Sequence, residues 1–215
     1  ALGDLYWILQ QESTAEATRI EEFLQSTFLA ADTVQPIRWA LADALSRLDM
    51  DMVVANIVQP ALKLIRESPE DHGHGAVRKI AKSLAYLIGL LHLRNREALT
   101  FLREQCLDIA GGRPRYDWST WATALTALGR IADPADGERL ALIAAGGSET
   151  LDLNQLFSEE WQRNYVRSSA LEALKDTGEL SQKLISAMNP LGADCTVGPT
   201  YYRAVREMYR RKKNN

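Results

Sequence analysis

Histidine and cysteine are scarce in this sequence, which has three histidines and two cysteines in 215 residues. Cys106 and Cys195 lack the short spacing of a zinc-binding pair, and neither has a histidine close by in the sequence. The one close histidine pair, His72 and His74, stands in a glycine-containing stretch. We interpret it as a solvated loop, because a metal site needs further ligands fixed by secondary structure. The sequence therefore predicts no metal and no cofactor.

Motifs of catalysis are missing as well. No Gly-x-Ser-x-Gly motif is present, and the glycine pairs at 111–112 and 146–147 do not lead into the Gly-Lys-Ser/Thr ending of a phosphate-binding loop. Adjacent carboxylates such as Glu159 and Glu160 point to different faces of a helix and indicate solvated surface. We expect no catalytic residues, and a protein that is not an enzyme.

Long apolar runs and a secretory leader are also absent from the sequence. The longest apolar stretch, residues 84–91, is far shorter than the ~20 residues that a membrane span needs. Asp4 interrupts the first apolar run, and no basic region precedes it, so we see no signal peptide. These features predict a protein without a membrane partner and with a cytoplasmic location.

Basic residues are not in excess, since the net charge is -3. A dedicated nucleic-acid-binding protein usually has a strong basic excess, so this partner is disfavoured, although a local basic patch stays open. Apolar residues make up 46% and charged residues 25%, which is typical of a folded protein and excludes a disordered one.

Apolar residues recur at helical spacing through most of the chain, with almost no strand-like alternation. Four stretches of this pattern resemble one another, at residues 37–45, 77–85, 120–128 and 166–174. Their starts lie 40, 43 and 46 residues apart, within the roughly 40–47 residues of HEAT and armadillo repeats. This spacing predicts a repeated helical fold.

A turn and a second helix are expected after each of these stretches. The predicted second helices cover residues 53–65, 98–109, 140–145 and 180–188, after turns at Asp49, Asn95, Asp133 and Gly178. Proline lacks the amide that a helix interior uses, so Pro60 should kink or split the first of these helices.

Two of the aligned stretches carry a family resemblance. Residues 124–134, ALTALGRIADP, resemble the HEAT-repeat pattern of alanine, leucine and glycine before an Asp-Pro turn, and residues 166–174 resemble its Val-Arg opening. The resemblance covers about residues 36–190, and it departs from the pattern at Thr120-Trp121 and at Ala85. Membership of this family implies a curved, right-handed stack of helices that generally works as a binding scaffold.

The fold class predicted from these patterns is all-α. We expect an α-solenoid of about four to five antiparallel helix pairs with capping helices at both ends. Residues 1–215 would form one domain, with an N-terminal cap pair at 1–35, repeats at 36–190, and a loop and C-terminal capping helix at 191–215.

Arginine recurs at one position of the aligned stretches, at Arg38, Arg78 and Arg167. A ladder of this kind suits contacts with phosphate or with an acidic partner. The alternative is that each arginine bonds carboxylates or carbonyls of the adjacent repeat. Arg210 and Arg211, in the basic C-terminal run, are either anion contacts or a solvated helix end.

The stretch at residues 111–118 combines the residue types that are enriched at binding hot spots. We take Arg113, Arg115, Tyr116 and Trp118 as candidate partner-binding residues. The alternative is a helix-entry loop whose Trp118 packs inward. Trp121, three residues further on, is expected to face the core.

The leading functional hypothesis is a non-catalytic scaffold or adaptor that binds another protein, as a fragment or subunit of a larger assembly. It rests on the fold and on the missing catalytic motifs. One alternative is binding of a nucleic-acid backbone along a groove. Another is a small-molecule site, since certain HEAT-repeat proteins of similar pattern assist the attachment of chromophores.

Overall fold

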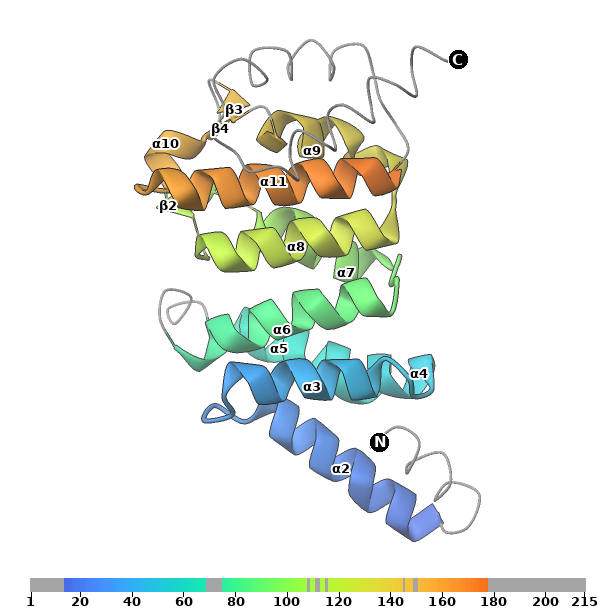
Figure 1. Cartoon of the computed structure of the whole chain (residues 1–215). Helices are drawn as coiled ribbons and strands as arrows, with labels where there is room; N and C mark the ends of the chain where they lie inside the picture. Colours follow the sequence, from blue (N-terminus) through green and yellow to red (C-terminus); the bar gives the residue numbers. More distant parts are fainter. Residues whose placement is uncertain are drawn as a thin grey trace. The chain divides into compact units, whose positions relative to one another are not determined.

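The computed structural model describes residues 14–68, 75–107, 109–110, 113–114, 116–144, 146–148 and 151–177 (Figure 1). Helices contain most of these residues, so the all-α class predicted from the sequence is confirmed. The chain divides into two compact units, Ala1–Phe101 and Leu102–Asn215. The single domain over residues 1–215 stays a prediction. The first part of the N-terminal cap pair, the helix expected at 180–188 and the C-terminal capping helix lie outside the described residues.

Helices of the first unit follow one another closely along the chain. They are α2 (Thr14–Leu29), α3 (Gln35–Leu45), α4 (Met50–Val53), the π-helix η1 (Val54–Val58), α5 (Gln59–Glu67), α6 (Ala76–Leu90) and α7 (Arg96–Thr100). A second π-helix, η2 (Phe101–Cys106), begins at the last residue of this unit.

The second unit contains three longer helices and several short elements. They are β1 (Ile109–Ala110), β2 (Arg113–Pro114), α8 (Trp118–Ile131), the 3₁₀-helix η3 (Pro134–Asp136), α9 (Gly137–Ala144), β3 (Gly147–Ser148), β4 (Leu151–Asp152), α10 (Leu153–Leu156) and α11 (Glu160–Thr177). The four aligned stretches of the sequence lie in α3, α6, α8 and α11, and all of them are helical, as predicted.

Short polar side chains begin several of these helices. Asp49, Asn95, Asp117 and Asp133 each accept a hydrogen bond from a backbone N–H in the first turn that follows. These amides have no partner within the helix, so such caps stabilise each helix start by ~1 kcal/mol. Pro36 stands in the first turn of α3, where its missing amide costs nothing.

Pro60 changes the hydrogen-bond pattern of its helix without ending it. The preceding turn is η1, whose last bond runs from the Gln59 N–H to the Val54 carbonyl. Pro60 stands in the first turn of α5, directly after this wider turn. Its missing N–H therefore falls where the hydrogen-bond pattern changes from π to α. The helix is therefore not split at Pro60; it passes from α to π and back to α.

In the first unit, α3 and α5 pack against α6. Gln35 at the start of α3 donates to Ser83 Oγ at 2.6 Å, and the ring of Trp39, one turn later, contacts Tyr86 with a centroid separation of 6.4 Å. The contacts advance along both helices together, so α3 and α6 run in the same direction (Figure 1). Their buried apolar residues, such as Leu84, form the core of this unit.

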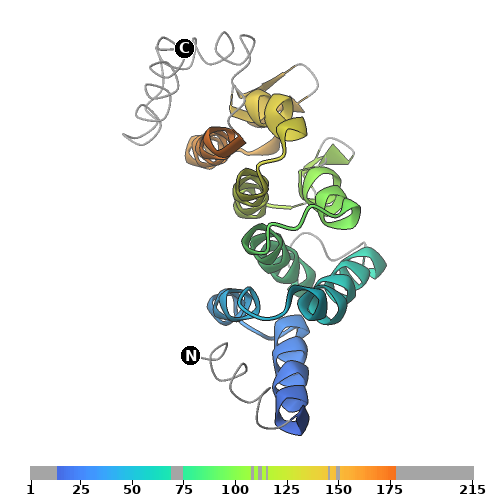
Figure 2. The same ribbon diagram turned by 90° about the vertical axis from the view of Figure 1, so that its right-hand side faces the viewer.

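In the second unit, α8 and α9 both pack against α11, as the end-on view of Figure 2 shows. Trp121 of α8 is fully buried, as expected, and its ring meets Phe157 at 5.4 Å and 83°. Cys106 is buried too.

An ion-pair network joins η2 to η3 inside the second unit. Arg103 donates to Asp136 at 2.7 Å and to Asp133 at 2.6 Å, and the Asp136 carboxylate is buried. The hydrogen bond to Asp136 is the main cause that raises the pKa of Arg103 above its ordinary value. The network therefore neutralises a buried carboxylate next to the Asp-Pro turn.

Two small antiparallel hairpins correct the sequence-based prediction. In the first, Ile109 of β1 pairs with Pro114 of β2, and in the second, Gly147 of β3 pairs with Asp152 of β4. The helix expected over residues 98–109 ends at Cys106, so Ile109 was wrongly placed in it. Glycines 111 and 112, poor helix formers, follow closely in the sequence and favour an earlier end.

Candidate functional site

Three aromatic rings meet at the surface of the second unit. The centroid of the Trp118 ring lies 4.8 Å from that of Trp161 and 5.3 Å from that of Tyr165, and both pairs are close to perpendicular, at 75° and 77°. Trp161 and Tyr165 are each 55% exposed, whereas Trp118 is half-buried. We call Trp118, Trp161 and Tyr165 the aromatic surface.

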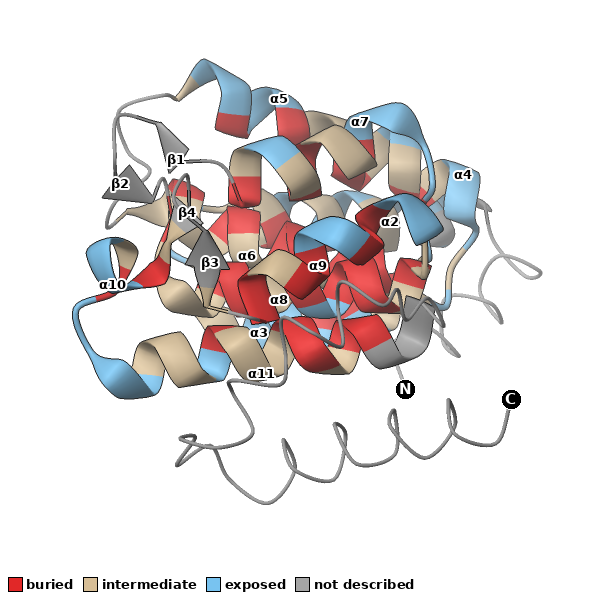
Figure 3. Ribbon diagram, turned by 90° about the horizontal axis from the view of Figure 1, so that it is seen from above, coloured by how far each residue is buried: buried red, intermediate tan, exposed pale blue. Residues whose placement is uncertain are grey.

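The positions of these rings follow from the helices that carry them. Trp118 is the first residue of α8, directly after its N-cap Asp117. Trp161 and Tyr165 are four residues apart on α11, so they lie on one face of it. Because both contact Trp118 and α8 packs along α11, the two helix beginnings lie side by side. The exposed beginning of α11 is coloured pale blue in Figure 3.

An aromatic cluster of this kind is suited to binding. Large apolar side chains that remain exposed together mark interaction surfaces more often than isolated ones do. Tryptophan and tyrosine contribute large contact areas with few rotatable bonds, and they dominate binding hot spots. Edge-to-face contact with Trp118 restrains the exposed rings, so less entropy is lost when a partner covers them.

Among the described residues, two carboxylates and one guanidinium stand at the beginning of α11, beside Trp161 and Tyr165. Glu159 and Glu160 are exposed at the beginning of α11. Arg163 donates its Nη1 to the carbonyls of Phe157 and Ser158, at 2.7 Å each, so its guanidinium is used within the fold.

The structure corrects one of the predicted partner-binding residues. Tyr116 is only 2% exposed, so it belongs to the core and presents no surface to a partner. Trp118 is partly exposed and contacts Trp161 and Tyr165. The sequence analysis did not identify Trp161 or Tyr165 as candidates. Arg113 lies in β2, and its side chain is outside the description; Arg115 lies outside the described residues.

The arginine ladder serves the fold at two of its three described positions. Arg38 is fully buried and donates to the carbonyls of Phe28, Ala30 and Thr33. Burial lowers its pKa below the ordinary value, and nearby Asp32 acts in the opposite direction. An external anion therefore has no access to Arg38, so of the two interpretations of the arginine ladder, hydrogen bonds to carbonyls describe this position.

Arg167 repeats part of this arrangement in the second unit. Its Nε donates to the carbonyl of Ala144, the last residue of α9, at 3.2 Å, just as Arg38 bonds Phe28 near the end of α2. Both arginines thus satisfy carbonyls that a helix end leaves open. Arg78 is half-buried and also interacts within the chain. Arg210 and Arg211 lie outside the described residues, as do His72 and His74.

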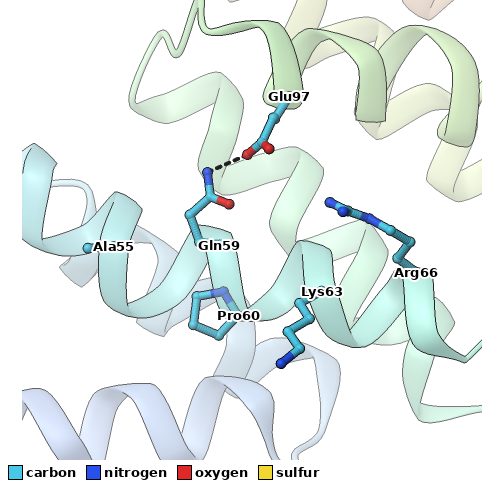
Figure 4. Close-up of a pocket in the computed structure, with 6 residues that line it drawn as sticks. All are labelled: Ala55, Gln59, Pro60, Lys63, Arg66 and Glu97. Atoms are coloured by element: carbon cyan, nitrogen blue, oxygen red, sulfur yellow. Dashed lines mark hydrogen bonds between the residues drawn. The ribbon is translucent and has the colours of Figure 1, made fainter.

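Two depressions in the first unit are weaker candidates. The first, about 370 Å³, is an apolar groove between α2 and α3, lined by residues that include the exposed Phe23 and Ile37. The second, about 510 Å³, lies between α5 and α7 (Figure 4). There Gln59 donates to Glu97 at 2.6 Å, and the Arg66 side chain reaches into the same space. Opposite charges share this open depression, so it favours no single class of ligand.

Within the part of the chain that the structure describes, no group of three histidine, cysteine or acidic residues is arranged to hold a metal ion. No helix among the same residues combines the length and the apolar run required to cross a bilayer. The sequence matches no protein-family model, and neither curated proteins nor solved structures give a match.

Proposed function

We propose that this chain is a non-catalytic protein-binding module, a scaffold or adaptor, whose partner docks on the aromatic surface. The observation that carries the proposal is the exposure of Trp161 and Tyr165, each 55%, on rings already restrained by Trp118. Rigid exposed aromatic rings are costly to leave in water, by about 25 cal/mol per Å² of apolar area, and a partner that covers them recovers this free energy.

The finer architecture belongs to the same proposal: a HEAT-like α-solenoid of antiparallel helix pairs. Three internal correspondences support it. Arg38 and Arg167, at one position of the aligned stretches, both bond a carbonyl near the end of an earlier helix, α2 and α9 respectively. Helices that carry aligned stretches pack together within each unit, α3 with α6 and α8 with α11. An aspartate or asparagine cap begins the helix after each of the first three aligned stretches.

The experiment that tests the function is capture of partners from a lysate of the source organism by the tagged chain, with and without nuclease. The proposal predicts a near-stoichiometric protein that survives nuclease and is lost when Trp161→Ala and Tyr165→Ala are combined. Phe23→Ala is the matched control, because Phe23 is 57% exposed but lies in the first unit.

Undiminished capture by the Trp161→Ala/Tyr165→Ala chain would refute the aromatic surface as the docking site. Loss of every partner on nuclease treatment would favour the nucleic-acid alternative instead, although the net charge of -3 disfavours it. The cytoplasmic location remains a prediction, which fractionation of cells that express the tagged chain would check.

A further inference from the structure

We infer that the partner segment on the aromatic surface is basic, with an arginine side chain stacked on the rings of Trp161 and Tyr165. The inference rests on the proposed function and names the chemistry of its partner. It is carried by a comparison between the two units and by the charges around the aromatic surface.

In the first unit, an aromatic pair between two helices forms a cation–π contact with a lysine of the chain. Trp39 of α3 and Tyr86 of α6 contact each other, and the Nζ of Lys82 lies 5.0 Å from the centroid of the Trp39 ring. A cation in this position is attracted by the negative face of the ring. Here the chain supplies the cation itself, from the residue one helical turn before Tyr86.

The aromatic surface of the second unit differs from this pair. Among the described residues, no lysine or arginine lies over Trp118, Trp161 or Tyr165. A near-perpendicular contact with Trp118 covers at most one face of each of the other two rings, and both residues are 55% exposed. An incoming cation would therefore find open π faces.

The two described arginines of this part of α11 bond backbone carbonyls and do not lie over the aromatic rings. Arg163 bonds the carbonyls of Phe157 and Ser158, and Arg167 bonds the carbonyl of Ala144. Glu159 and Glu160 meanwhile present exposed carboxylates in the turn that carries Trp161. Their charge offsets the positive end of the α11 dipole and attracts a cationic partner.

Arginine suits this surface better than lysine does. Its guanidinium is planar and weakly hydrated, so it stacks flat on an aromatic face and still donates hydrogen bonds at its rim. A carboxylate from Glu159 or Glu160 can accept one of those bonds. The expected partner is thus a protein segment in which arginine side chains project from an extended or helical backbone.

The test uses the full chain and two synthetic peptides, acetyl-(Gly-Arg)₄-amide and the same peptide with citrulline in place of every arginine. Citrulline has nearly the shape of arginine but no charge. Fluorescence anisotropy of labelled peptides should show the arginine peptide binding about tenfold more tightly, because only this peptide offers a cation to the aromatic rings.

Substitutions test whether peptide binding depends on the rings of Trp161 and Tyr165. Trp161→Leu combined with Tyr165→Leu keeps apolar area but removes both π faces, and it should erase the preference for arginine over citrulline. Glu159→Gln combined with Glu160→Gln should weaken arginine binding a few-fold and reduce its salt dependence. Phe23→Ala should leave both affinities unchanged, and circular dichroism of each variant checks that the helices remain folded.

The outcomes separate this inference from the proposed function. Equal binding of the two peptides, binding that survives the double leucine substitution, or no arginine binding up to millimolar concentration would each overturn the basic partner. Protein capture that still depends on Trp161 and Tyr165 would, in those cases, leave the docking function standing. Capture that is indifferent to both residues would remove the docking function itself.

Discussion

The rings of Trp118 and Trp161 meet at 75° with their centroids 4.8 Å apart, although they belong to different helices of the second unit. Trp118 is half-buried and Trp161 is mostly exposed, so the contact ties a surface ring to the core. This relationship makes the aromatic surface rigid as well as apolar, and rigidity is what distinguishes a hot spot from an exposed side chain that moves freely.

The first prediction concerns the strength of this contact. Trp161→Ala should lower the free energy of unfolding by only about 1 kcal/mol, because an exposed ring loses one aromatic contact and little buried area. A double-mutant cycle with Trp118→Ala should give a coupling energy of about 1 kcal/mol. Urea unfolding of the four proteins measures both quantities. A coupling near zero would mean that the rings do not support each other.

Arg38 provides the second prediction. Arg38→Met removes a guanidinium that is bound to three carbonyls and fully buried, and it leaves those carbonyls without a donor. The free energy of unfolding should fall by about 3 kcal/mol, and Arg38→Lys should recover only part of it, because an ammonium cannot match the planar fork. The control is Arg66→Met, an exposed arginine, for which a change within about 0.5 kcal/mol is expected. Equal losses at the two positions would contradict the capping role of Arg38.

The Arg103–Asp136 ion pair gives the third prediction. Asp136 is 2% exposed, so Arg103→Leu would leave a buried carboxylate without its partner and should cost about 3 kcal/mol in urea unfolding. Adding Asp136→Leu should restore part of that loss, because the unpaired charge is then gone. Should the double variant instead be less stable by the full sum of the two single changes, the pair would contribute through packing alone.

The fourth prediction uses a strained backbone position. Ala132 ends α8 with a φ of 52°, in the left-handed region that favours glycine. Ala132→Gly should therefore raise the free energy of unfolding by about 0.5–1 kcal/mol. The same substitution at Ala40, exposed within α3, should lower it by about 1 kcal/mol. Opposite signs for one chemical change test the backbone geometry directly.

The helices were predictable because each contains its own pattern. The stretches at 37–45, 77–85, 120–128 and 166–174 have apolar residues at helical spacing, and this local signal suffices to place α3, α6, α8 and α11. The turns at Asp49 and Asn95 were predictable from equally local signals. The hairpins were not predicted, because strands of two residues have no periodicity to read.

The aromatic surface was predicted only in part, for a different reason. Trp118 stood out beside Arg113 and Arg115, but Trp161 and Tyr165 come from a helix distant in sequence, and only packing brings them to Trp118. Their four-residue spacing was the available signal, since it places two large aromatics on one helix face. Tyr116 was misjudged because burial of a residue beside a helix start depends on the tertiary fold and not on its neighbours in sequence.

Docking of a protein partner at Trp161 and Tyr165 is tested most directly by photocrosslinking from the surface itself. The photoreactive residue p-benzoylphenylalanine would replace Tyr165 in one chain and Phe23 in a control chain of similar exposure. Irradiation in lysate should give a discrete protein adduct from position 165, absent from position 23 and lost when Trp161→Ala is added. An adduct from position 23 alone, or none from position 165 while the partner is still captured, would contradict docking at the aromatic surface.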